Sequence, residues 1–138
     1  MLFIKEYRDF DFDRGEGEVI ISDGRFELSC YADLFYPKTS NLESNYQLIP
    51  LSVDELKTDV EGKYYIQKLD SPYFSYKLFG KLYFEDKIRI QIGDIKIVLS
   101  SYDVPGDIRS GCFVSVVVSR IDITRNNTNV EKKKKINH

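Results

Sequence analysis

Acidic side chains crowd the first 27 residues of the 138-residue chain, and their type and spacing suit the binding of a cation or of a basic surface. Between residues 9 and 27 only two basic residues stand among seven carboxylates: Asp9, Asp11, Asp13, Glu16, Glu18, Asp23 and Glu27. The alternation of residues 9–13 predicts a strand with the aspartates on one face and phenylalanines on the other. A negative patch of this kind docks a basic protein surface, because complementary charge raises association rates and selects partners. The alternative is that the carboxylates keep the protein soluble and protect a strand edge.

Calcium is the cation that such carboxylates suggest first, but their spacing does not form an EF-hand loop. A loop starting at Asp9 needs glycine at its sixth position and glutamate at its twelfth. Arg14 and Ile20 stand at those positions, so this loop is excluded, and a calcium site of another geometry is the alternative left open. We expect the protein to hold no metal and no cofactor.

Catalytic groups are sparse in this sequence. The single histidine, His138, lies in a polar tail, so the body of the chain cannot assemble a Ser-His, Cys-His or histidine–metal constellation. Cys30 and Cys112 have no adjacent basic residue to activate them, and we interpret both as reduced, buried thiols. Paired carboxylates serve as acid and base in glycosidases, but nothing in the sequence indicates a sugar pocket. We therefore expect no enzymatic activity.

Aromatic residues gather between residues 64 and 84. They are too numerous for one buried face of the predicted strands, so some tyrosines should be exposed. Exposed tyrosine is enriched at protein interfaces and also stacks on bases, which makes Tyr65, Tyr73, Tyr76 and Lys77 an alternative nucleic-acid-binding set. The simpler interpretation is that these rings are core residues and scattered surface positions.

A first hairpin is indicated by apolar runs on either side of Asp23-Gly24, a pair typical of a type I′ turn. That turn pairs Ser22 with Arg25. Period-two alternation then predicts a buried face made of Gly17, Val19, Ile21, Phe26, Leu28 and Cys30. The opposite face holds Glu16, Glu18, Ile20, Glu27, Ser29 and Tyr31, and most of it should be exposed to solvent.

A second hairpin is indicated by isoleucine-rich runs around Gly93-Asp94. Glycine at the first position of a two-residue loop favours a type II′ turn, which pairs Ile92 with Ile95. Further strands are predicted at residues 63–69, 76–84 and 113–123. The last has apolar residues on both faces, so we expect a central strand, and Gly80 marks a bulge or bend in the one before it.

One short helix is predicted near residues 52–60. Ser52 and Glu55 have the spacing of a capping box, in which each side chain bonds the backbone amide of the other residue. Gly62 is placed to end this helix after about two turns. These residues should therefore form a helical plug between strands.

The composition is that of one folded β-rich domain, residues 1–124, followed by a disordered basic tail, residues 125–138. With 42% hydrophobic residues the body should bury a core without disulfides or metal. The tail has five basic residues and one acidic residue, whereas the body has 15 basic and 21 acidic residues. No apolar run is long enough for a secretory signal or a membrane span, so we expect a soluble cytoplasmic protein that does not engage a membrane.

Two parts of the chain resemble the cold-shock domain. Arg14-Gly15-Glu16-Gly17-Glu18-Val19, with Asp23-Gly24 and Phe26-Glu27-Leu28 after it, resembles the opening of that domain. Near the other end, Pro105-Gly106-Asp107-Ile108 and Gly111-Cys112-Phe113-Val114-Ser115-Val116 resemble the closing strand of cold-shock and related OB-fold barrels. The resemblance implies a small barrel whose outward aromatic side chains stack on the bases of single-stranded nucleic acid.

The positions of those stacking rings hold other residue types in this chain. Glu16 and Glu18 stand at two of them and Cys30 at a third, while Glu27 and Ser29 also face outward. Stacking is worth about 1–3 kcal/mol per base, and carboxylates repel phosphate. If the chain is such a barrel, its usual nucleic-acid face has become acidic.

We therefore predict an all-β fold, either a small antiparallel β-barrel of OB type or a compact β-sandwich, with one short helix. The expected function is that of a non-enzymatic cytoplasmic protein-binding module, such as an inhibitor or immunity-type protein that blocks a basic partner. The docking residues are then Asp9, Asp11, Asp13, Glu16, Glu18 and Glu27. The alternative is an OB-fold protein that binds single-stranded nucleic acid through the aromatic set, and the oligomeric state stays open.

Overall fold

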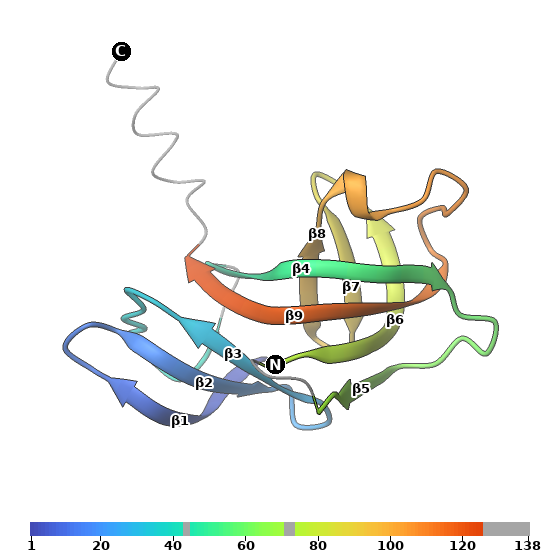
Figure 1. The fold of residues 1–138 in the computed structure, drawn as a ribbon. Coiled ribbons are helices and arrows are strands. Elements are labelled where there is room, and N and C mark those ends of the chain that lie inside the picture. Colours follow the sequence, from blue (N-terminus) through green and yellow to red (C-terminus); the bar gives the residue numbers. More distant parts are fainter. Residues whose placement is uncertain (43–44, 71–73, 126–138) are drawn as a thin grey trace, which may run out of the picture.

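The computed structural model describes residues 1–42, 45–70 and 74–125 and shows an all-β chain (Figure 1). The strands are β1 (Phe3–Asp11), β2 (Glu16–Ser22), β3 (Glu27–Ala32), β4 (Tyr46–Thr58), β5 (Tyr65–Lys68), β6 (Tyr76–Phe84), β7 (Ile88–Ile92), β8 (Ile95–Leu99) and β9 (Phe113–Arg125). The one helical element in this described part is a 3-10 turn, η1 (Ser101–Asp103). The all-β class predicted from the alternating, aromatic-rich sequence is confirmed.

Five of the strands close into a barrel, in the order β4–β8–β7–β6–β9 and back to β4. β6, β7 and β8 form an antiparallel meander, and β9 pairs antiparallel with both β6 and β4. The ring closes where Leu48 of β4 pairs in parallel with Ile97 of β8. This barrel is compatible with an OB-like fold and decides against the sandwich that the sequence left open.

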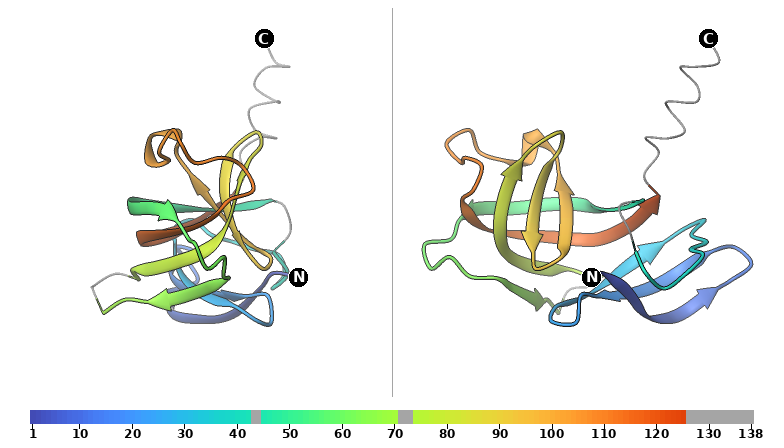
Figure 2. Two further views of the ribbon diagram at one scale, coloured as in Figure 1. Left: turned by 90° about the vertical axis from the view of Figure 1, so that its right-hand side faces the viewer. Right: turned by 180° about the vertical axis from the view of Figure 1, so that it is seen from behind.

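β1, β2 and β3 lie outside the ring and form an antiparallel unit, here named the extension. It joins the barrel through parallel pairing of β3 with β9, at Tyr31 with Asp122 and at Ala32 with Ile123. Figure 2 shows the extension projecting past one end of the barrel. A single cluster of buried apolar side chains runs through both parts, so the extension shares the core of the barrel.

β9 is the strand that holds the two parts together. It pairs with β3, β4 and β6, as expected of an apolar run without a polar face. Its buried apolar side chains, Val114, Val116, Val118, Ile121 and Ile123, all belong to the single core, and the burial alternation changes phase at Arg120, which has a φ of 28°. The prediction that this segment is a central strand is confirmed.

The prediction of a helix near residues 52–60 is wrong, because residues 52–58 belong to β4. In the ladder with β9, Ser52 lies opposite Ser119. A capping box supplies only local hydrogen bonds, whereas the valine-rich β9 supplies a long ladder and apolar neighbours, so tertiary pairing overrides the local signal. A capping box does occur at Ser100 and Asp103, where it begins η1.

The first predicted hairpin forms with a register shifted by two residues. Ser22 pairs with Glu27 rather than with Arg25, which leaves a four-residue loop. The Asp23 carboxylate accepts hydrogen bonds from the amides of Arg25 and Phe26, at 2.9 and 2.7 Å, and so stabilises the longer loop. An even shift keeps each side chain on its own face, and Val19, Ile21, Leu28 and Cys30 of the predicted core face are buried. The prediction that the opposite face is mostly exposed is wrong, because Ile20 and Ser29 are buried and only Glu27 of that face is fully exposed.

The second hairpin is confirmed, with Ile92 opposite Ile95 and Gly93 at a φ of 60°. β6 bends as predicted at Gly80, where its partner on one edge changes from β5 to β7 (Figure 1). A Cβ atom at Gly80 would lie 2.5 Å from the carbonyl oxygen of Gln91. Glycine therefore permits the close approach of β6 and β7 at this bend.

Candidate functional site

The alternating aspartates do not share one strand face as predicted. Asp9 has a left-handed backbone with φ of 47°, and the register of β1 against β2 shifts around it. Gly17 makes room for this bulge, since a Cβ atom there would lie 2.7 Å from the carbonyl oxygen of Asp9. β1 ends at Asp11, whose carboxylate accepts hydrogen bonds from the amides of Asp13 and Arg14. Asp11 thus stabilises a turn, while Asp9 and Asp13 are exposed.

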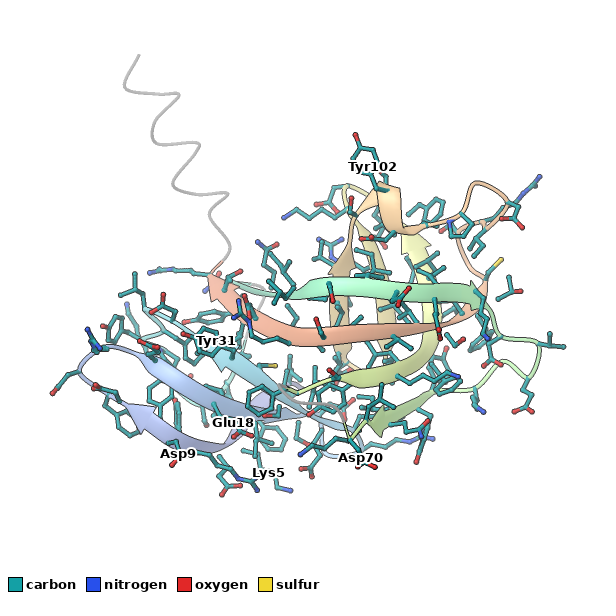
Figure 3. All side chains as sticks on the ribbon, in the orientation of Figure 1. Lys5, Asp9, Glu18, Tyr31, Asp70 and Tyr102 are labelled. Carbon is teal, nitrogen blue, oxygen red and sulfur yellow. The ribbon has the colours of Figure 1, made fainter. Side chains whose placement is uncertain are left out.

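The three glutamates of the predicted docking face lie on β2 and β3 of the extension. Each has a partner within the molecule: Tyr31 Oη donates a hydrogen bond to Glu16, Ser29 Oγ donates to Glu18, and Lys5 Nζ lies 2.7 Å from Glu27. Figure 3 labels Lys5, Glu18 and Tyr31 on this part of the extension, and Glu18 lies opposite Tyr31 in the ladder of β2 and β3. Much of their charge and hydrogen-bonding capacity is therefore used inside the sheet.

Cationic side chains complete the same face. Arg8 lies opposite Glu18 in the ladder of β1 and β2. The Arg120 guanidinium lies 4.9 Å from the ring centre of Tyr31 and donates two hydrogen bonds to Asp122, at 2.9 and 3.1 Å. The Tyr31 hydroxyl, which donates to a glutamate, has its pKa raised mainly by that hydrogen bond. This face is a network of matched charges rather than a uniform negative patch.

The free carboxylates lie at the far end of the extension, in a group that we name the acidic tip. It consists of exposed side chains from the β1–β2 turn, its approach and the segment after β3: Asp9, Phe12, Asp13, Asp33, Leu34 and Tyr36. Two contacts hold the turn and the segment together: Phe35 N donates to Gly15 O and Tyr36 Oη donates to Asp13 O, each at 3.0 Å.

Apolar side chains are exposed at the acidic tip. Phe12 is 66% exposed, Leu34 73% and Tyr36 57%. Phe12 packs edge-on against Tyr7, with ring centres 5.1 Å apart, which fixes one side of its ring. An apolar centre bordered by charged residues is the usual make-up of a protein interface. Sequence reasoning missed residues 33–36 because they follow no strand or helix period.

A second exposed surface, on the barrel, combines lysines with aromatic rings, and we name it the lysine–aromatic face. Lys63 and Lys77 lie over the ring of Phe79, with Nζ at 4.4 and 5.4 Å from its centre. Lys81 lies over Phe113, with Nζ 5.5 Å from the ring centre. Tyr64 and Tyr65 extend the face: the first packs against Phe113 and the second against Phe79.

The alternative set from the sequence is only partly brought together here. Tyr65 and Lys77 belong to the lysine–aromatic face, and Tyr65 is 51% exposed. Tyr76 was wrongly included, because it points into the core and its hydroxyl accepts a hydrogen bond from the amide of Ser29. Tyr73 lies outside the described residues. Lys81 was missed, although the alternation of β6 places it on the same face as Lys77.

Clustered metal ligands are absent from the described residues, and both cysteines are free thiols. The described residues contain no group of three or more His, Cys, Asp or Glu side chains that could hold a metal ion. Cys30 is fully buried, and burial raises the pKa of its thiol, which keeps it protonated and unreactive. Cys112 is a free thiol and is partly exposed. No described helix is long and apolar enough to cross a membrane.

Comparisons with protein-family models, with curated proteins and with solved structures find no match to this chain. The segments that resemble the opening of a cold-shock domain lie on β2, β3 and their turns, in the extension rather than in the barrel. The segment that resembles the closing strand leads into β9, which does belong to the barrel. The barrel is therefore built mainly from other parts of the chain than the resemblance used.

Proposed function

We propose that this protein is a non-enzymatic, cytoplasmic protein-binding module that docks a basic partner through the acidic tip, in the manner of an inhibitor or immunity-type protein. One observation carries the proposal: exposed Phe12, Leu34 and Tyr36 belong to two segments of the extension that hydrogen bonds hold together, and both segments carry exposed carboxylates. The apolar side chains supply contact area, and the carboxylates supply steering and partner selection.

The distribution of charge supports a basic partner. Residues 1–42 contain nine acidic and five basic residues, whereas residues 45–125 contain eleven of each. Among the described residues no ion pair involves Asp9, Asp13 or Asp33, so their negative charge is available to a partner. Glu16, Glu18 and Glu27 then act mainly as the support of the docking surface.

Charge reversal at the acidic tip tests this function. A variant with Asp9, Asp13 and Asp33 changed to lysine should bind the basic partner recovered from the source cells about tenfold or more weakly, chiefly through slower association. The control reverses Glu55, Asp70 and Asp107, which are exposed carboxylates of the barrel part. Equal affinity of the two variants and the wild type, measured by biolayer interferometry, would overturn the proposal.

A second candidate function is the binding of single-stranded nucleic acid by the lysine–aromatic face. Its support is the three lysines, each within 5.5 Å of an aromatic ring centre, beside partly exposed tyrosines. Such a surface can attract phosphate and stack bases.

Fluorescence anisotropy with labelled DNA and RNA strands of about 15 nucleotides tests the second candidate. Binding should weaken steeply between about 50 and 200 mM salt, and Tyr65→Ala should weaken it further. Tyr102→Ala is the control, because Tyr102 is 98% exposed and lies on η1, away from this face (Figure 3). Absence of binding at low salt would exclude this function.

A further inference from the structure

Leu34 has a backbone conformation that its residue type disfavours. Among the described residues, five non-glycine residues have positive φ: Asp9, Leu34, Glu55, Phe74 and Arg120. Leu34, with φ of 52°, is the one of these that is both apolar and exposed. A left-handed conformation costs free energy because it brings Cβ too close to the following carbonyl oxygen. An exposed apolar side chain does not offset that cost, since it gains no hydrophobic stabilisation from burial.

The fold holds Leu34 in place from both sides. Ala32, two residues earlier, is fully buried and pairs with both Gly17 and Ile123. Phe35, one residue later, is also buried, and its ring packs against Tyr46 with centres 5.3 Å apart. The chain is therefore held on both sides of Leu34, whose side chain is exposed.

Gly15 strengthens the second anchor. A Cβ atom at Gly15 would lie 2.6 Å from the amide nitrogen of Phe35, so glycine allows the β1–β2 turn to approach this segment closely. The resulting hydrogen bond from Phe35 N to Gly15 O is 3.0 Å long. Strained conformations persist only where the surroundings over-determine them, and they concentrate at sites of function.

We infer that Leu34 is the anchor of the docking site and that it inserts into an apolar pocket of the partner, bordered by cationic side chains. This inference rests on the proposed function and specifies its partner. The cationic border follows from charge complementarity with Asp9, Asp13 and Asp33, exposed carboxylates that are close in the chain to Phe12 or to Leu34. Because the side chain is held in its projecting position before binding, little ordering cost remains when the partner arrives.

Photo-crosslinking in the source cells tests the contact directly. The photoreactive residue p-benzoylphenylalanine is placed at position 34 of the full chain, with position 102 on η1 as the matched exposed control. The expected product joins position 34, and not position 102, to one basic protein, at a peptide that carries apolar residues. A crosslink to an acidic protein, to nucleic acid or to a second copy of the chain would overturn the inference.

Two substitutions of Leu34 test the role of its side chain separately from docking at the acidic tip. With the photoreactive residue at position 12, both Leu34→Ala and Leu34→Asn should reduce the crosslink about tenfold, since both remove the side chain. Asparagine tolerates a left-handed backbone, so Leu34→Asn should also raise the melting temperature by about 3 °C or more, while Leu34→Ala should leave it unchanged.

The outcomes distinguish the two proposals. An undiminished crosslink from position 12 in both variants would show docking at the acidic tip without Leu34 as its anchor. No crosslink from position 12 or 34 in the otherwise unchanged chain would overturn the proposed function as well. A melting temperature of Leu34→Asn at or below that of Leu34→Ala would contradict the strain on which the inference depends.

Discussion

Tyr76 is a buried side chain of the barrel whose hydroxyl accepts a hydrogen bond from the backbone amide of Ser29, at 3.0 Å. Ser29 belongs to β3, so this bond links the barrel to the extension. Burial raises the pKa of the Tyr76 hydroxyl, which is consistent with a neutral phenol at physiological pH. Tyr76, which the sequence placed in the nucleic-acid-binding set, thus connects the barrel to the extension.

Removal of this hydroxyl should cost stability. Tyr76→Phe leaves the buried amide of Ser29 without its partner, and we expect the free energy of unfolding to fall by about 1–3 kcal/mol. Urea denaturation followed by circular dichroism measures the change. Tyr102→Phe, at a fully exposed position, is the control and should have no effect. A stability of Tyr76→Phe equal to that of the control would mean that the bond contributes nothing.

Two tight turns, far apart in the sequence, determine how the strands meet. The Asp23 carboxylate bonds the amides of its own loop and also accepts a hydrogen bond from the amide of Asp94, in the turn between β7 and β8, at 2.9 Å. Burial alone would raise the pKa of Asp23, but the backbone amides of both turns outweigh it and hold the pKa below its ordinary value. The extension and the barrel therefore meet at an ionised carboxylate.

Stability should follow the ionisation of Asp23. A lowered pKa in the folded state means that its contribution is complete above the ordinary value of 3.8 and is lost as the pH falls through the lower folded value. Asp23→Asn should therefore be less stable than the wild type at pH 7, and the difference should shrink on acidification to about pH 2. Urea midpoints across this range measure the effect. A constant difference at all pH values would contradict it.

The bend of β6 depends on a residue without a side chain. Gly80→Ala should lower the free energy of unfolding by about 1–3 kcal/mol, because the added methyl group meets the backbone of β7 and the side chain of Ile92. Gly106→Ala is the matched control, since a Cβ atom at Gly106 has nothing within 4 Å. Thermal unfolding of both variants measures the contrast. Equal melting temperatures would show that the bend relaxes without cost.

The molecule as a whole has an acidic part and a part with balanced charge, built around one core. Buried side chains of the extension and of the barrel belong to the same apolar cluster, and β9 contributes to both parts. Ile121 and Ile123 of β9 would be uncovered if the extension detached. The acidic tip thus belongs to a part of the chain that shares its core with the barrel.

One core predicts one unfolding transition. Urea unfolding followed by far-ultraviolet circular dichroism should coincide with unfolding followed by tyrosine fluorescence. Leu28→Ala, in the extension, should shift both curves together and lower the free energy of unfolding by about 2–5 kcal/mol, because Leu28 is fully buried. Two separate transitions, or a shift of only one signal, would show that the extension folds independently.

Local patterns determined the parts of this fold whose partners are close in sequence. The β7–β8 hairpin follows from Gly93 and the alternating isoleucines, since a two-residue turn sets the register of the strands beside it. Alternation in residues 16–32 likewise set the buried face of the first hairpin. The all-β class and the central position of β9 follow from composition and from apolar residues on both faces of one run.

Contacts between distant segments decided the rest. Residues 52–58 became a strand because β9 lies beside them, and the first hairpin gained a longer loop that Asp23 ties to Asp94. The glutamates predicted to dock a partner also bond side chains of other strands within the extension. The exposure of Leu34 also depends on tertiary structure. Buried neighbours on both sides fix its backbone conformation, and no helical or strand periodicity in the sequence predicts that this leucine is exposed. The sequence by itself determined the all-β class and the β7–β8 hairpin, because these depend on composition and on local turn and alternation patterns. Only packing between distant segments determined that residues 52–58 form a strand and which charged and apolar side chains remain exposed.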